Sequence, residues 1–168
     1  MTAEVPEKFR EAMSAFPSGV TIMTTIDGEG ERRGFAASSF CSLSLDPPLV
    51  LVCLGKTAQC HDAFMESDTW AIQVAAAGHV DLISRFATKG SDKFAGGEFE
   101  ADARGVPILN DAAVVLGCTA HERYDGGDHT ILIARVESVT LRDHAPAIYF
   151  QREFRELELN ADDLEETA

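Results

Sequence analysis

The stretch GFAASSFCSLSLDPPLVLVCLGK, residues 34–56, decides the fold because it joins two strand patterns through a forced turn. Residues 41–46 alternate apolar and polar side chains, which predicts a strand with one apolar and one polar face. Pro47-Pro48 cannot donate hydrogen bonds to a sheet, so the chain turns there. Residues 49–54 are apolar throughout, which predicts a strand covered on both faces. The small and hydroxyl-bearing residues make this stretch the expected ligand-binding segment.

Short strand patterns recur along the rest of the chain. From β-branched and apolar residues we predict further strands at residues 20–26, 70–75, 112–124, 130–141 and 148–150. Amphipathic patterns predict helices at residues 7–16, 57–67 and 79–87, with Thr57 as the candidate N-cap of the second. We expect the first helix to pack against the core and the second to offer its first backbone N–H groups to an anion. Six or more strands with two or three helices indicate a β-barrel flanked by helices.

The composition is that of a globular protein with one domain. The chain has 168 residues, of which 45% are hydrophobic and 25% charged, which is enough for a single core. No apolar run approaches the roughly 20 residues that cross a bilayer, and the first residues lack a secretory pattern, so we expect a cytoplasmic location. The 14 Lys and Arg against 28 Asp and Glu give a net charge of −14, which argues against nucleic acid or an anionic membrane as partner. Any site for a phosphorylated cofactor must therefore gather local cations.

The cysteines and histidines form no metal-binding pattern. Cys41, Cys53, Cys60 and Cys118 contain no C-x-x-C pair, and we expect free, buried thiols. The histidines form no H-x-x-x-H or H-E-x-x-H array, so no metal site is expected, and His61 is expected to face solvent.

Two nucleotide-binding motifs are excluded by residue identity. Gly55-Lys56-Thr57 is similar to the end of a P-loop, but Val50 stands where that motif needs a glycine. Gly28-Glu29-Gly30 is similar to the start of a dinucleotide fingerprint, but its third glycine would fall at Arg33, which we expect to be solvated like Arg32. Without a Rossmann domain, a hydride donor such as NADH would have to bind against another ligand.

Two specific motifs, in the same order, carry a resemblance to a known family. Residues 42–50, reading SLSLDPPLV and followed by Lys56-Thr57, and residues 127–131, reading GDHTI, resemble the flavin reductase family with the FMN-binding split-barrel fold. The resemblance covers about residues 9–157 and includes weaker matches such as Arg85-Phe86-Ala87. It implies a mainly β fold with flanking helices, built as a six-stranded Greek-key split β-barrel. On this basis we predict a flavin reductase-like domain at residues 1–157, followed by a flexible acidic tail at residues 158–168.

The resemblance also implies an activity. It predicts NAD(P)H-dependent reduction of free FMN or FAD by a homodimeric flavin reductase that supplies reduced flavin to a partner monooxygenase. NADH or NADPH would be the hydride donor, and the sequence leaves both choices of cofactor open. A flavin-binding carrier or sensor, or an FMN-dependent oxidase of the same fold, would share these motifs without the reductase turnover.

The family motifs place the site residues. The resemblance implies that His129 is catalytic, orienting the nicotinamide or stabilising charge at the ring edge. It assigns the serines to the ring and ribityl chain, Lys56, Thr57 and Gln59 to the phosphate, and Lys93 and Phe94 to one side of the ligand. The cofactor-binding residues that it implies are Ala37, Ser38, Ser39, Ser42, Ser44, Lys56, Thr57, Gln59, Phe86, Lys93, Phe94, His129 and Tyr149.

Overall fold

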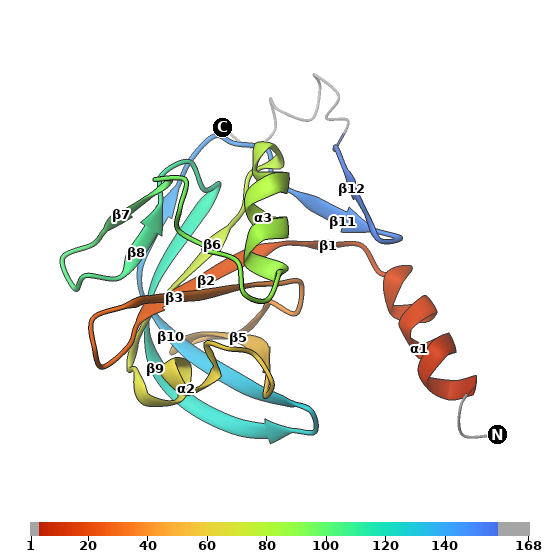
Figure 1. The fold of residues 1–168 in the computed structure, drawn as a ribbon, viewed down its shortest axis with the longest axis horizontal. Helices are drawn as coiled ribbons and strands as arrows, with labels where there is room; N and C mark the ends of the chain where they lie inside the picture. The colour runs from red at the N-terminus through yellow and green to blue at the C-terminus, as the bar shows by residue number, and fades with distance from the viewer. Residues whose placement is uncertain (1–3, 158–168) are drawn as a thin grey trace.

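The computed structural model describes residues 4–157, which form a β-rich body with few helices (Figure 1). The helices are α1 (Glu4–Ser14), α2 (His61–Glu66) and α3 (Val80–Ala87), the last preceded by a 3-10 turn at Ala77–His79. The strands are β1 (Ser18–Gly19), β2 (Thr21–Ile26), β3 (Arg32–Ala37), β4 (Cys41–Leu45), β5 (Pro48–Gly55), β6 (Thr69–Val74), β7 (Phe99–Ala101), β8 (Pro107–Leu109), β9 (Val114–Gly126), β10 (His129–Leu141), β11 (Ile148–Phe150) and β12 (Glu153–Arg155).

One large antiparallel sheet organises the fold. Its seven strands run in the order β3-β2-β6-β9-β10-β5-β4, beside smaller sheets β1-β11-β12 and β7-β8. The mainly β architecture with few helices is therefore confirmed. The sheet has seven strands where six were predicted, and no ladder between its edge strands β3 and β4 closes it within the described residues.

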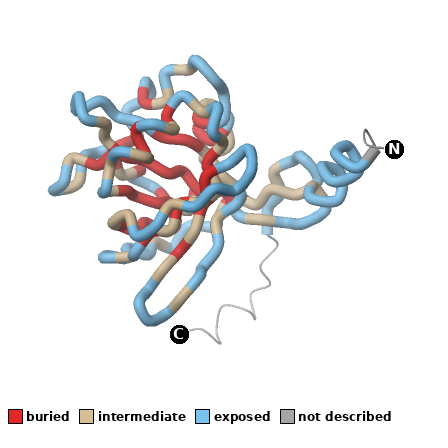
Figure 2. Tube along the Cα trace, turned by 90° about the horizontal axis from the view of Figure 1, so that it is seen from below, coloured by how far each residue is buried: buried red, intermediate tan, exposed pale blue. Residues whose placement is uncertain are grey.

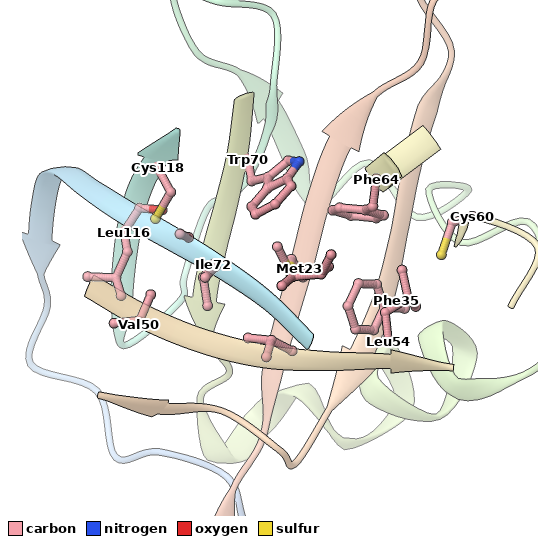
Figure 3. Packing of buried hydrophobic residues seen from close by; sticks show 13 residues of the cluster. Met23, Phe35, Val50, Leu54, Cys60, Phe64, Trp70, Ile72, Leu116 and Cys118 are labelled. Carbon is pink, nitrogen blue, oxygen red and sulfur yellow. The ribbon is translucent and has the colours of Figure 1, made fainter. Parts of the chain in front are cut away.

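The sheet is strongly curved around a core. Two register shifts in the long β9–β10 hairpin, between Ile133/Ala134 and Val136/Ser138, are of the kind that bends a strand. Phe35 of edge strand β3 and Leu54 of β5, near the opposite end of the sheet, belong to the same cluster of buried side chains (Figure 3). The two ends of the sheet therefore approach each other.

The buried clusters explain why these sequences form these elements. Trp70 and Phe64 are fully buried in the cluster inside the sheet, and the Phe64 ring lies 5.1 Å from that of Phe35 in edge contact. A second cluster packs α3 against β2 and its neighbours, with Phe86 from the helix and Ile22 from the strand fully or almost fully buried. Every second residue of β5 is buried, namely Val50, Val52 and Leu54, as expected for a strand with one face against the core.

The apolar residues of β4 and β5 are less covered than predicted. Leu49 and Leu51 of β5 are only half-buried, while Leu43 and Leu45 of β4 are 47% and 92% exposed. The prediction of a strand buried on both faces was wrong, because only one face of β5 meets the core within the described residues. Pro47-Pro48 does mark the turn between the strands, as predicted.

The two N-terminal helical predictions need correction. Helix α1 exists, but Phe9, Met13 and Phe16 are 61%, 54% and 72% exposed, and the helix extends away from the sheet (Figure 2). Among residues 4–157 its apolar side chains are therefore not packed into the core, and the predicted packing role was wrong. Helix α2 begins at His61 instead of Thr57, and its N-cap Cys60 makes no capping side-chain hydrogen bond. The predicted Thr57 cap was therefore wrong, and six residues are too few to support the expected anion site.

The cysteine prediction is confirmed in part. All cysteines are free, but only Cys60 and Cys118 are buried, Cys53 is half-buried and Cys41 is exposed. No group of three potential metal ligands occurs within residues 4–157. No described helix is both long enough and apolar enough to span a membrane. The predicted acidic tail, residues 158–168, lies outside the described residues, and the predicted domain boundaries stay a prediction.

Candidate functional site

The main pocket opens where the curved sheet brings β3 close to β5. Its volume is about 350 Å³. It is lined by residues 34–39, 53–55, 58–60 and 86–89, together with Lys93 and His129. We call this the first pocket. Much of its wall therefore comes from residues 34–56, and the end of α3 and the start of β10 complete it.

A serine side chain joins the two sides of this pocket. The Ser39 Oγ accepts a hydrogen bond from the Cys53 backbone N–H at 3.0 Å and donates to the Cys53 carbonyl at 3.3 Å. The Ser39 hydroxyl thus takes the place that a neighbouring strand would occupy at this point of β5. This contact fixes the distance between the segment after β3 and the wall opposite.

The cations of the first pocket are not neutralised by carboxylates. Lys89 and Lys93 line it, and no Asp or Glu does. The Lys93 ammonium donates to the carbonyls of Phe86 at 2.7 Å and Thr88 at 3.0 Å, where α3 ends. Burial lowers the pKa of Lys93 below its usual range. The ammonium is therefore fixed at the end of a helix, where a positive charge is favourable.

The loop after α3 is fastened to the turn after β5. The Gln59 Oε1 accepts a hydrogen bond from the Gly90 N–H at 2.9 Å, and the Ser91 hydroxyl donates to the Arg85 carbonyl at 2.6 Å. Gln59 and Lys93 consequently lie at a fixed position on one rim of the pocket.

His129 begins β10 and lines the same pocket. Its Nδ1 lies 2.7 Å from Asp128 Oδ1, and 47% of its side chain is exposed. The hydrogen bond to His129 lowers the pKa of Asp128, so the carboxylate accepts from Nδ1–H and Nε2 is left for a ligand. Gly55 stands opposite, where an added Cβ would lie 3.8 Å from Nε2.

Two further pockets adjoin the first. The second pocket, of about 370 Å³, includes Arg32, Arg33 and Phe94 and shares Gln59 and Lys93 with the first. The third pocket, of about 270 Å³, has apolar walls that include Val20, Ile83, Tyr149 and Phe154, and it shares residues 36–38 with the first. We refer to these three adjoining pockets together as the groove, whose second pocket is lined by charged residues and whose third has apolar walls.

The groove contains most of the residues expected to bind the cofactor. The first pocket is lined by Ala37, Ser38, Ser39, Gln59, Phe86, Lys93 and His129. Phe94 lies at the second pocket and Tyr149 at the third. The residues that line none of the three are Ser42, Ser44, Lys56 and Thr57. Lys56 instead pairs with Asp125 of the β9–β10 turn, and the two serines lie on edge strand β4.

Several residues of this region were not expected from the sequence. Lys89 had no predicted role, and the exposed Arg32 was expected only to be solvated, yet both line the groove. His61 was expected to face solvent, but its side chain is 18% exposed and its Nε2 lies 2.9 Å from Thr130 Oγ1. That prediction was wrong because α2 packs beside the start of β10. No spacing in the sequence indicates these long-range contacts.

The chain matches known proteins over almost its whole length. A family model described as flavin reductase like domain matches residues 13–158. The actinorhodin polyketide dimerase of Streptomyces coelicolor is 47% identical over 149 residues, covering 88% of this chain and 84% of that protein. The NADH:riboflavin 5'-phosphate oxidoreductase of Streptomyces pristinaespiralis is 40% identical, covering 89% and 86%.

Other matches include a monooxygenase component and a solved structure. The reductase subunit HsaB of a Rhodococcus jostii flavin-dependent monooxygenase is 36% identical over 154 residues, covering 91% of this chain and 78% of that subunit. The NADH:FAD oxidoreductase SgcE6 of Streptomyces globisporus C-1027, solved with NAD and FAD fragments, superposes with a TM-score of 0.87 at 34% identity. That superposition covers 94% of this chain and 95% of the other.

Proposed function

We propose, because this chain belongs to the family of flavin reductase like domains, that it is an NAD(P)H:flavin oxidoreductase that reduces FMN or FAD. The observation that carries this proposal is the first pocket. It gathers Lys89 and Lys93 without a carboxylate in a chain whose net charge is −14. Such a site favours an anionic ligand against the overall charge of the protein.

The residues of the first pocket fit a flavin. Its volume of about 350 Å³ lies in the range of small-molecule sites. Small apolar side chains, Ala36, Ala37 and Ala58, suit the face of a flat ring, while the hydroxyls of Ser38 and Thr88 suit its polar edge.

The chain contributes placement and charge to the reaction. A bound flavin supplies the chemistry of hydride acceptance. Asp128 holds the imidazole of His129 through Nδ1 and leaves Nε2 at the pocket rim, where it can hydrogen-bond the ring edge or the nicotinamide. Lys93 keeps a positive charge beside the ligand.

NADH oxidation by the purified protein tests the proposal. Oxidation that depends on added FMN or FAD and saturates with it would support a flavin reductase, and repeating it with NADPH would identify the preferred donor. Flavin binding, seen as quenched fluorescence, without consumption of either nucleotide would contradict the reductase activity and leave a carrier. We expect His129→Ala to slow turnover on the order of a hundredfold with little change in flavin affinity. His121→Ala, which alters an exposed histidine outside the groove, is the matched control.

The same family membership supports a finer architecture and a partner. We propose a split barrel, because Phe35 and Leu54 meet in one core from strands near the two ends of the sheet. We also propose a homodimer, because Phe9 and Met13 of α1 and Phe16 just after it are large apolar side chains that are more than half exposed. Sedimentation velocity tests this, and a monomer at micromolar concentration would contradict it. A flavin-dependent monooxygenase is the proposed consumer of reduced flavin, as the similarity to HsaB suggests.

A further inference from the structure

The second pocket contains an arginine, Arg32, that is stacked on an aromatic ring. The Arg32 guanidinium lies 4.8 Å above the centre of the Phe94 ring and forms no ion pair with any described residue. Its neighbour Arg33 differs, because its Nε lies 2.8 Å from Asp27 Oδ2. Arginine is suited to planar, bidentate recognition of phosphate, and stacking on Phe94 preorganises its N–H donors.

The second pocket lies next to the first. Gly34, Gln59, Cys60 and Lys93 line both. A ligand whose ring lies between β3 and β5 would reach Arg32 by extending past Gln59, which lines both pockets.

The second pocket also contains two carboxylates, and neither is paired with Arg32. Glu31 and Asp92 line the same pocket, but neither forms an ion pair with Arg32. The Asp92 Oδ1 instead accepts a hydrogen bond from the Phe94 N–H at 3.3 Å. Lys93, at the junction of the two pockets, adds a second positive charge.

Most of the residues that the family resemblance assigns to the flavin phosphate lie outside the three pockets. Lys56 forms an ion pair with Asp125, and neither Lys56 nor Thr57 lines any of the three pockets. Of the residues expected near the phosphate, only Gln59 lies in the groove, and it faces both pockets.

We propose that the second pocket binds the phosphate of a flavin whose ring lies in the first pocket, with Arg32 as the principal donor. The proposal rests on the proposed function and assigns a role to a residue that the sequence left solvated. It predicts that the protein selects phosphorylated flavins, FMN or FAD, over riboflavin, which has the same ring and ribityl chain but no phosphate.

Flavin fluorescence titrations test this assignment with riboflavin, FMN and FAD. We expect Arg32→Ala to weaken binding of FMN and FAD about tenfold and to leave riboflavin within about twofold, because one charge-assisted contact is lost. Arg32→Lys keeps the charge and should recover part of the loss. The control variant Arg135→Ala removes the same charge from an exposed ion pair outside the groove and should change FMN binding less than about twofold.

Three results would overturn the assignment. An equal loss of riboflavin and FMN affinity in Arg32→Ala would show that the residue supports the ring site instead. A larger loss of FMN affinity in Lys56→Ala than in Arg32→Ala would indicate that the phosphate binds at the turn after β5. An increased KM for NADH in Arg32→Ala, measured with riboflavin as acceptor, would indicate that the second pocket binds the pyridine nucleotide instead of the flavin phosphate. If the unaltered protein binds none of the three flavins, the proposed function itself fails.

Discussion

Replacing Ser39 with alanine separates a structural role of this residue from ligand binding. The Ser39 hydroxyl makes two hydrogen bonds to the Cys53 backbone, at 3.0 Å and 3.3 Å, across the wall of the first pocket. The family resemblance instead assigns this serine to the flavin. We expect Ser39→Ala to loosen the contact between the segment after β3 and strand β5, and to weaken flavin binding only as a consequence.

The size of the effect follows from the geometry. A neutral hydrogen bond contributes about 0.5–1.5 kcal/mol to stability, and these two are exposed while one of them is long, so we expect a total loss of about 1 kcal/mol. For a chain of this size that lowers Tm by roughly 2–4 °C. The same energy is a factor of about five in the exchange rate of the Cys53 amide hydrogen, if that hydrogen exchanges through local opening.

Amide hydrogen exchange, thermal unfolding and flavin titration on the same samples provide the assay. Ser42→Ala is the matched control, because this serine lies on exposed edge strand β4 and its side chain forms no hydrogen bond within the described residues. The reasoning would be refuted if Ser39→Ala lowered flavin affinity by tenfold or more while Tm and exchange at Cys53 stayed unchanged. That outcome would mean that the hydroxyl binds the ligand directly.

Two further predictions concern packing and pH. In Gly34→Ala the new Cβ would lie 2.8 Å from the Met23 carbonyl oxygen, so we expect the free energy of unfolding, measured with urea, to fall by about 1–3 kcal/mol. The control Gly28→Ala, whose new Cβ would have no atom within 4 Å, should be neutral or slightly stabilising. An unchanged free energy of unfolding in Gly34→Ala would contradict the close packing. Burial raises the pKa of Cys60 from 9.0 to about 11. As the pH rises, the unfolded chain therefore loses the Cys60 thiol proton before the folded chain does. The stabilisation from the protonated thiol is complete below pH 9, and the free energy of unfolding should fall by about 2 kcal/mol as the pH rises to 11. Cys60→Ala should show a smaller decrease over the same interval, and equal slopes would count against a buried thiol.

The central strands could be predicted from the sequence because their determinants are local. The alternation in β4, the apolar run in β5 and the proline pair between them all act within a few residues of each other. Short strands such as β7 and β12 were missed, because three residues carry too little periodicity to distinguish them from loop. Their pairing with β8 and β11 depends on the surrounding fold.

The site could be predicted only where its residues belong to motifs. The family resemblance grouped His129, Ser38 and Ser39 from motifs far apart in the sequence, and all three line the first pocket. The ion pair between Lys56 and Asp125 could not be predicted, since 69 residues separate the partners. The apolar face of α1 was correctly located in the sequence, but an amphipathic pattern does not say whether its partner is the same chain.

The net charge of the chain and the charge of the groove act over different distances. At physiological ionic strength the Debye length is about 8 Å, so exposed carboxylates beyond that distance contribute little to the potential inside the pocket. Within the first pocket the charged side chains are Lys89 and Lys93, although the whole chain carries −14. The acidic exterior therefore acts mainly on the approach of an anionic nucleotide at low salt, and added salt should relieve that repulsion. Contacts made inside the groove, including the one proposed for Arg32, weaken with salt instead. A phosphorylated flavin should consequently show association and dissociation rates that both rise with ionic strength, whereas riboflavin, which has no phosphate charge, should show little change in either.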